Sequence, residues 1–218
     1  MTVDPVAAAG LVAREVRSGS RDGAPTKIVI ARRTYPAGQA DLWDALTSAD
    51  RIPRWFLPVS GELKVGGRYQ LQGNAGGVVE RCDEPESFAV TWEFGGMVSW
   101  LRVTLVPDGR GTRLELAHEA HVDPGMWGQF GPGAVGVGWD LGLMGLGLYI
   151  ESGAPVDPAT AVTFPASPDG AEFIRRAAAG WADAAVKDGD ESGPAHEAAE
   201  RTVTFYTVPP DNTVPPGN

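Results

Sequence analysis

Residues 85–122 read PESFAVTWEFGGMVSWLRVTLVPDGRGTRLELAHEAHV, three alternating runs separated by Gly-Gly and Pro-Asp-Gly turn signals. In the first run, Phe88, Val90 and Trp92 fall on one face, with mainly polar side chains between them. Alternation with a period of two residues is typical of half-buried antiparallel strands. The stretch therefore predicts a three-stranded meander with one apolar face.

The segments before this meander continue the pattern. Residues 11–19 and 26–35 flank an Asp-Gly turn signal and predict a β-hairpin. From Gln39 the apolar spacing changes to i, i+3, i+4, which predicts a short helix, and a second short helix begins at Ser48. Strand alternation returns in GGRYQLQ and GVVERC, which lie between residues 66 and 82.

A long apolar segment, GPGAVGVGWDLGLMGLGLYIES, occupies residues 131–152 after the meander. Its most apolar part, 134–150, is shorter than the roughly 20 residues that cross a bilayer, and it contains Asp140. We therefore predict a buried helix that covers the apolar face of the sheet. Glycine in a helix interior costs about 1 kcal/mol relative to alanine. The repeated glycines thus indicate close approach to the sheet, room for a ligand, or a dimer contact.

The C-terminal part of the chain has acidic residues, proline-rich spacers and two helical patterns. The first pattern starts at Ser167 and carries an apolar stripe that includes Trp181, and the second covers about 195–207. The last ten residues are rich in proline, which predicts disorder. The predicted divisions are a main domain at 11–150, a helical C-terminal extension at 151–208 and a disordered tail at 209–218.

The composition disfavours several classes of protein. The 218 residues include 28 acidic and 18 basic side chains, and the formal net charge of −10 disfavours binding to nucleic acid or to an anionic membrane. The single cysteine, Cys82, excludes an internal disulfide and fits a reducing compartment. The first residues carry no basic segment ahead of their short apolar stretch, so we predict no signal peptide and a cytoplasmic protein.

Taken together, the segments resemble a known superfamily. The blocks that carry the resemblance are ARRTYPAGQADLWDALTSADRIPRWF (31–56), GGRYQL (66–71), PESFAVTWEF (85–94), GTRLELAHEA (111–120) and GWDLGL (138–143). They resemble the START-like, or SRPBCC, superfamily over roughly residues 25–150, and within it the branch similar to the C-terminal domain of the activator of heat-shock protein 90 ATPase. The resemblance implies an α+β helix-grip (START/Bet v 1-like) fold, in which a curved antiparallel sheet surrounds a long C-terminal helix.

The resemblance also implies an apolar cavity between sheet and helix. Domains of this kind resemble carriers or sensors of small apolar molecules, and a few relatives are cyclases or other enzymes. We expect binding of a small hydrophobic ligand, with no chemistry and no cofactor. The candidate pocket residues are inward-facing or lie where the second short helix ends: Trp55, Phe56, Tyr69, Phe88, Trp92, Leu116, His118, Trp139 and Leu143.

Each candidate has a simpler interpretation. The aromatic side chains could fill the core instead of lining a cavity, and His118 could be a satisfied interior histidine. In the functional interpretation, His118 contacts a polar group of the ligand, or acts as a general base with Asp140 or Glu80 in a cyclase- or hydrolase-type enzyme. No catalytic residue is assigned. A third hypothesis is a protein-interaction or co-chaperone-like module that uses the acidic tail, and a homodimer is a further expectation.

Two other motifs carry no site. His118 and His121 fall on opposite faces of one predicted strand and have no close ligand spacing with Cys82, so no metal site is predicted. GPGAVG (131–136) matches G-x-G-x-x-G by letter, but no βαβ unit surrounds it, and a loop leading into a helix is favoured.

Trp100 alternates away from Leu101 and Val103, towards the outer face of the predicted sheet. A large exposed aromatic side chain indicates cover by another element. The predicted cover is the pair of tail helices, through Trp181 and Phe205, or else a partner subunit.

Overall fold

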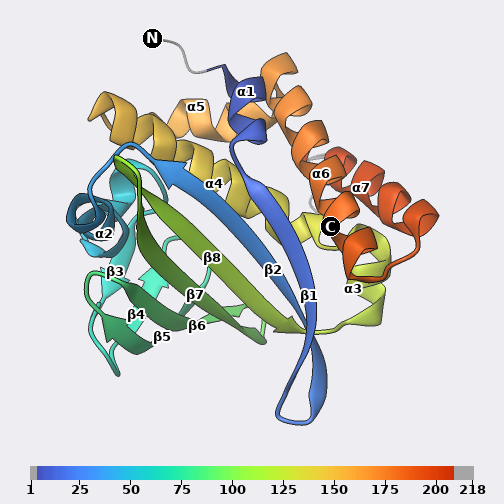
Figure 1. Ribbon diagram of the computed structural model, residues 1–218, viewed down its shortest axis with the longest axis horizontal. Coiled ribbons are helices and arrows are strands. Elements are labelled where there is room, and N and C mark those ends of the chain that lie inside the picture. The colour runs from blue at the N-terminus through green and yellow to red at the C-terminus, as the bar shows by residue number, and fades with distance from the viewer. Residues whose placement is uncertain (1–3, 209–218) are drawn as a thin grey trace, which may run out of the picture.

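A computed structural model describes residues 4–208, and Figure 1 shows how its elements are arranged. Eight strands form one antiparallel sheet in the order β1-β2-β8-β7-β6-β5-β4-β3. The strands are β1 (Ala13–Arg21), β2 (Ala24–Tyr35), β3 (Val59–Gly61), β4 (Arg68–Leu71), β5 (Gly76–Asp83), β6 (Ser87–Phe94), β7 (Met97–Asp108) and β8 (Gly111–His121).

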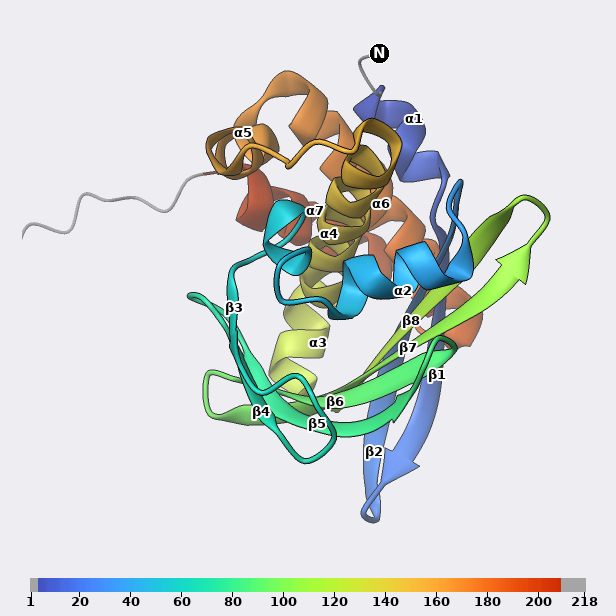
Figure 2. The ribbon, with the colours of Figure 1, turned by 90° about the vertical axis from the view of Figure 1, so that its left-hand side faces the viewer.

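Helices precede, interrupt and follow this sheet. The helices are α1 (Pro5–Gly10), α2 (Gln39–Thr47), the 3₁₀ turn η1 (Ile52–Arg54), α3 (Pro124–Phe130), α4 (Gly133–Ser152), α5 (Pro158–Thr163), the 3₁₀ turn η2 (Phe164–Ala166), α6 (Pro168–Asp188) and α7 (Ser192–Thr207). The sheet curves around α4, which lies along its concave side (Figure 2). The predicted α+β helix-grip architecture is thereby confirmed.

Local sequence explains the sheet register. Asp22 and Gly23 both have positive φ, 53° and 79°, as a two-residue hairpin turn between right-twisted strands requires. The predicted meander pairs in register, with Phe88 opposite Val103 and Val103 opposite Leu116. Because side chains alternate between faces, this register places apolar residues of β6, β7 and β8 in rows on the concave side.

The C-terminal extension packs against the main domain. Helix α6 contacts β1, α1 and α4, and α7 contacts α6 and α3. Ser167 caps α6 as expected, because its side chain accepts a hydrogen bond from the backbone N–H of Gly170. Asp188, at the other end of α6, bonds the backbone N–H of Ser18 and so occupies part of the free edge of β1. The predicted tail at 209–218 lies outside the described residues.

The glycines of α4 accommodate neighbouring side chains and loops. A Cβ at Gly136 would lie 2.3 Å from the indole of Trp181 in α6, and a Cβ at Gly145 would lie 2.7 Å from the carbonyl oxygen of Trp55. At these two positions the approaching groups come from α6 and the loop after η1, which none of the three predicted explanations named. Sequence alone did not specify these partners, because both are distant along the chain. The predicted close approach to the sheet occurs at Gly147, where a Cβ would lie 2.3 Å from the guanidinium of Arg33 in β2.

Helix α4 has the length and hydropathy of a membrane span, and it is the one helix among residues 4–208 that does. Half of the qualifying window is buried inside the molecule. Its partners are β2, α1, α6 and α7. These contacts are those of a core helix, as the sequence predicted.

Several short elements and one contact differ from the predictions. Helices α1, α3 and α5 and strand β3 were not predicted, and the second short helix, expected to begin at Ser48, is the 3₁₀ turn η1 at Ile52–Arg54. The predicted cover of Trp100 by the tail helices was wrong. The guanidinium carbon of Arg21 lies 4.1 Å from the centre of the Trp100 ring, and the ring of His121 meets it edge-on. The tail helices lie elsewhere, because Trp181 packs on α4 and Phe205 packs on Phe130.

Candidate functional site

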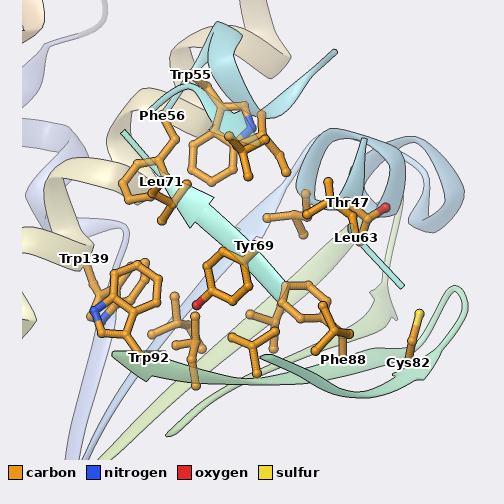
Figure 3. A pocket seen from close by; sticks show the side chains of 18 residues that line it. Thr47, Trp55, Phe56, Leu63, Tyr69, Leu71, Cys82, Phe88, Trp92 and Trp139 are labelled. Atoms are coloured by element: carbon orange, nitrogen blue, oxygen red, sulfur yellow. The ribbon is translucent and has the colours of Figure 1, made fainter. Parts of the chain in front are cut away.

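A cavity of about 150 Å³ lies between the concave face of the sheet, the α2–η1 segment and α4. Figure 3 shows Trp92 and Trp139 beside each other at one end and Phe88 near Cys82 at the other, with the ring of Tyr69 between them. Phe56 and Trp55 close a further side. The site is an apolar space that is partly open to solvent, and six of its eighteen lining residues are aromatic.

Seven of the nine predicted pocket residues line this cavity, namely Trp55, Phe56, Tyr69, Phe88, Trp92, Leu116 and Trp139. Eleven further residues complete the lining: Leu46, Thr47, Ile52, Val59, Leu63, Leu71, Val79, Cys82, Val90, Leu101 and Val103. Alternation already placed Leu71, Val90, Leu101 and Val103 on the inner faces, so a signal for those four existed. No periodic signal identifies Val59 or Leu63, which lie in a three-residue strand and the loop after it.

The two remaining predicted residues lie behind the lining. His118 pairs across the sheet with Leu101, which does face the cavity, but the imidazole packs against the rings of Trp92 and Trp139. Leu143 is buried in α4, and its carbonyl oxygen accepts hydrogen bonds from Arg33 and Tyr35. Neither side chain belongs to the lining, and of the two only His118 packs against rings that do.

Aromatic contacts join Trp55 and Phe56 to the Trp92–Trp139 end of the cavity. The ring centres of Trp55 and Phe56 are 5.3 Å apart, and those of Phe56 and Trp139 are 6.2 Å apart, both in stacked geometry. Trp139 then meets Trp92 at 5.0 Å and an interplanar angle of 60°. Such pairs contribute roughly 0.5–1.5 kcal/mol beyond the burial of area, so they stabilise this arrangement of the wall.

Protein acceptors already engage most polar groups of the lining. The hydroxyl of Tyr69 donates to the carbonyl oxygen of Thr91, and the indole N–H of Trp55 donates to that of Ala45. The Thr47 hydroxyl bonds back to the carbonyl of Trp43 within α2. Burial raises the pKa of the Tyr69 phenol, so this group is neutral and acts as a donor.

Two polar groups of the lining lack a protein partner among residues 4–208: the indole N–H of Trp92 and the thiol of Cys82. Burial, with the nearby Glu84 and Asp83, raises the pKa of this thiol, which keeps it protonated and weakly nucleophilic. The lining contains no charged side chain within the part of the chain that the structure describes. The cavity can therefore hold a neutral apolar group and has no counter-ion for a charged one.

The acid–base pairs considered for an enzyme do not form. Asp140 points to the opposite side of α4, where it accepts hydrogen bonds from Arg14 and from the indole of Trp181. Glu80 is exposed on β5. His118 bonds Trp139 and Ser99 instead, and burial lowers the pKa of its imidazole to about 4. A general base that works near neutral pH needs a pKa close to that pH, and the buried imidazole of His118 does not have one.

Metal-ligating residues do not gather at the site. Among the described residues, no group of three His, Cys, Asp or Glu side chains could hold a metal ion. His118 and His121 face opposite sides of β8, since His121 packs on Trp100 at the outer face. The GPGAVG motif spans the end of α3 and the start of α4, where Gly131 has a φ of 56° and ends the shorter helix.

Residues 36–150 match the family model described as Activator of Hsp90 ATPase homolog 1-like protein. The chain belongs to this family. The family region contains every residue that lines the cavity. The resemblance predicted from the sequence is confirmed, and the match ends within α4, before the C-terminal extension begins.

Solved members and neighbours have the same fold. The crystal structure of CalU16 from Micromonospora echinospora is 31% identical, with a TM-score of 0.64, and the match covers 79% of this chain and 97% of that one. DynU16, described as a putative protein in the dynemicin biosynthetic locus, is 22% identical over 59% of this chain and 48% of its own, with a TM-score of 0.52.

A more distant neighbour is the Aha1 dimer from Colwellia psychrerythraea, 16% identical over 58% of this chain and 97% of its own, with a TM-score of 0.50. DynU16 and Aha1 share the fold at identities too low for further comparison. No curated protein matches the chain.

Proposed function

We propose that this protein binds a small, neutral molecule with an apolar ring in the cavity between the sheet and α4. The observation that carries the proposal is the apolar cavity with six aromatic side chains in its wall, whose lining among residues 4–208 contains no charged side chain. Because an unpaired ion is costly to bury, such a lining favours neutral ligands. Binding free energy comes chiefly from removing apolar surface from water.

The size of the cavity limits the ligand that fits without rearrangement. Apolar cavities of about 150 Å³ stay dry and bind molecules of the size of benzene. The cavity here has a volume of about 150 Å³. A larger ligand extends through the open side of the cavity or requires movement of a wall, and the α2–η1 segment with Trp55 and Phe56 forms much of the lining outside the sheet and α4. We therefore propose a single ring, or one ring of a larger molecule, as the buried group.

Membership of the family supports a binding role and leaves the ligand open. A cytoplasmic location and a homodimer stay predictions for this chain. The Colwellia psychrerythraea protein is described as a dimer. The acidic helical extension covers α4 and β1, so a protein-interaction role would use its outer face and not the cavity.

Fluorobenzene titrated against the protein and followed by ¹⁹F NMR tests the proposal. We expect saturable binding, competition by toluene, and no competition by benzylammonium or benzoate, which add a charge to the same ring. Burial of an unpaired ion costs several kcal/mol, which weakens binding roughly hundredfold or more. Absence of saturation by fluorobenzene, or equal competition by the charged compounds, would contradict the proposal.

Matched variants locate the binding. Val90→Phe adds a ring inside the cavity, whereas Val106→Phe makes the same change at an exposed position of β7. We expect loss of fluorobenzene binding in the first variant and unchanged binding in the second. Leu71→Phe, from β4, fills the cavity from another wall if Val90→Phe disturbs folding. Retained binding in both folded cavity variants would place the ligand elsewhere.

A further inference from the structure

A chain of hydrogen bonds runs behind the Trp92–Trp139 wall. The indole N–H of Trp139 donates to Nδ1 of His118 at 2.9 Å. Nε2 of His118 lies 2.7 Å from Oγ of Ser99, and Oγ of Ser99 donates to the carbonyl oxygen of Trp92 at 3.0 Å. The chain thus links α4 to β8, β7 and β6 through three consecutive bonds.

One arrangement of protons satisfies all three bonds. Because the indole nitrogen only donates, Nδ1 of His118 must accept, and a neutral imidazole then carries its proton on Nε2. That proton goes to Oγ of Ser99, whose own proton goes to the carbonyl of Trp92. Protonated histidine does not fit, since its Nδ1–H would face the N–H of Trp139.

The surroundings favour this neutral form. His118 is 6% exposed and packs between the rings of Trp92 and Trp139, at centre distances of 5.9 and 5.8 Å. Desolvation by burial lowers the pKa of the imidazole to about 4. At neutral pH the ring is therefore a fixed donor and acceptor, and it is not a proton shuttle.

We propose that His118 and Ser99 are positioning residues of the ligand cavity, which hold the indole of Trp139 against Trp92 and so fix the wall on which a flat ligand stacks. The inference rests on the proposed ligand-binding function. It assigns roles to two side chains that do not line the cavity. Their contribution to affinity is preorganisation, because a wall that is already ordered loses less entropy when the ligand binds.

The same bonds also decide which polar groups a ligand meets. His118 accepts a hydrogen bond from the indole N–H of Trp139. If His118 is removed, this N–H becomes an unpaired donor. Leucine or phenylalanine at position 118 fills similar space but cannot accept this bond. The role therefore depends on the imidazole nitrogens as well as on the volume of the ring.

The ligand-free protein gives the first test, by ¹⁵N NMR. We expect the Nε2–H tautomer for His118 and slow solvent exchange for the indole N–H of Trp139. Ser99→Ala removes the acceptor of the Nε2–H group. We expect this variant to lower the population of the Nε2–H tautomer and to speed the exchange of the Trp139 indole N–H. The indole N–H of Trp55, bonded to Ala45, is the internal control and should not change. An Nδ1–H tautomer, or unchanged Trp139 exchange in Ser99→Ala, would overturn the proposal.

Chemical rescue gives the second test. In His118→Ala, we expect fluorobenzene affinity to fall roughly fivefold or more, about the effect of one buried hydrogen bond. Added imidazole should restore the slow exchange of the Trp139 indole N–H, which is measured without fluorobenzene because small apolar rings compete with it for the cavity. Thiophene, a ring of similar size without a nitrogen, should not. His121→Leu changes the other histidine of β8, on the outer face, and should leave both readouts as in the wild type.

The outcomes separate the two proposals. Equal rescue by thiophene and imidazole would show that His118 only fills space and would overturn the positioning role. If fluorobenzene fails to bind the wild type, the proposed function fails, and the NMR signatures in the ligand-free protein still decide whether His118 fixes Trp139. If His118→Ala does not fold, Ser99→Ala carries the affinity measurement, again with an expected decrease.

Discussion

The guanidinium of Arg14 in β1 holds the fully buried carboxylate of Asp140 in α4 through two hydrogen bonds, of 3.0 and 3.1 Å. Arg14 also donates to the carbonyl oxygens of Val12 and Ala9, and the indole of Trp181 donates to Asp140. Burial raises the pKa of Asp140, while Arg14 and Trp181 stabilise its ionised form. The pair ties the first strand to the core helix and to the C-terminal extension.

Removal of one partner should destabilise the protein strongly. Arg14→Leu leaves a buried carboxylate without its counter-ion, and such changes cost about 3–5 kcal/mol in the free energy of unfolding. The double variant Arg14→Leu with Asp140→Leu should be more stable than the sum of the two single losses implies. Urea unfolding measures all three. A loss below about 1 kcal/mol in Arg14→Leu would contradict the inferred coupling.

Two glycine substitutions in α4 should have opposite effects. Gly136→Ala places a Cβ 2.3 Å from the indole of Trp181, and we expect a loss of about 1–3 kcal/mol through overpacking. Gly142→Ala places its Cβ 3.4 Å from the ring of Phe56, an ordinary contact, and the helix preference of alanine should add up to about 1 kcal/mol. Thermal unfolding monitored by circular dichroism compares them, and equal effects would contradict the packing described for α4.

Stability should depend on pH through His118. The imidazole pKa is 6.5 in the reference state and about 4 in the folded protein. Between these values the unfolded chain binds a proton that the folded chain does not, so the free energy of unfolding rises with pH in this window and is constant above it. The full contribution is about 3 kcal/mol.

The contribution of His118 can be isolated with His118→Phe. Carboxylates with lowered pKa values, such as Glu119 and Asp188, also make stability rise with pH in the acid range. The free energy of unfolding is measured against pH for the wild type and for His118→Phe. Subtracting one curve from the other removes the contribution of these carboxylates. A difference that does not change between pH 4 and 6.5 would show that the imidazole is not buried in its neutral form.

A fragment limited to residues 11–150 should not fold cooperatively. It lacks α6, whose Trp181, Phe173 and Ile174 are fully buried, and it leaves Asp140 without one of its donors. It also lacks α1, which contacts both α6 and α4. Thermal unfolding and the dispersion of ¹⁵N–¹H spectra would report this directly. A sharp transition with native-like dispersion would instead support the predicted boundary at residue 150.

Much of the fold could be predicted because its signals are local. Alternation identified β6, β7 and β8, Asp22-Gly23 identified the first hairpin, and Ser167 identified the start of α6. Helices of six or seven residues, such as α1 and α5, carry too few apolar positions for a periodic signal. Their presence depends on the surfaces that they contact.

The candidate site was predicted only in part, for the same reason. The alternation of side chains along each strand placed Trp92, Leu116 and His118 on the inner face. Alternation does not say which of these side chains reaches the cavity and which lies behind it. Trp139 comes from a different element and lies against His118, which puts the imidazole one layer behind the wall. Leu63 enters the cavity from a loop, where no period applies.

The sequence by itself determined the strands, the core helix and the neutral apolar character of the inner face. Those properties follow from residue type and from spacings of two to four positions, which the local backbone geometry translates directly into faces. The family was predicted separately, from the resemblance of five sequence blocks to known members. Only the tertiary structure decided that Asp140 pairs with Arg14, 126 positions away, that Gly136 receives Trp181, and that His118 supports the cavity from behind. These relationships join residues far apart in the chain, and packing of the whole molecule, which no local period encodes, brings them together.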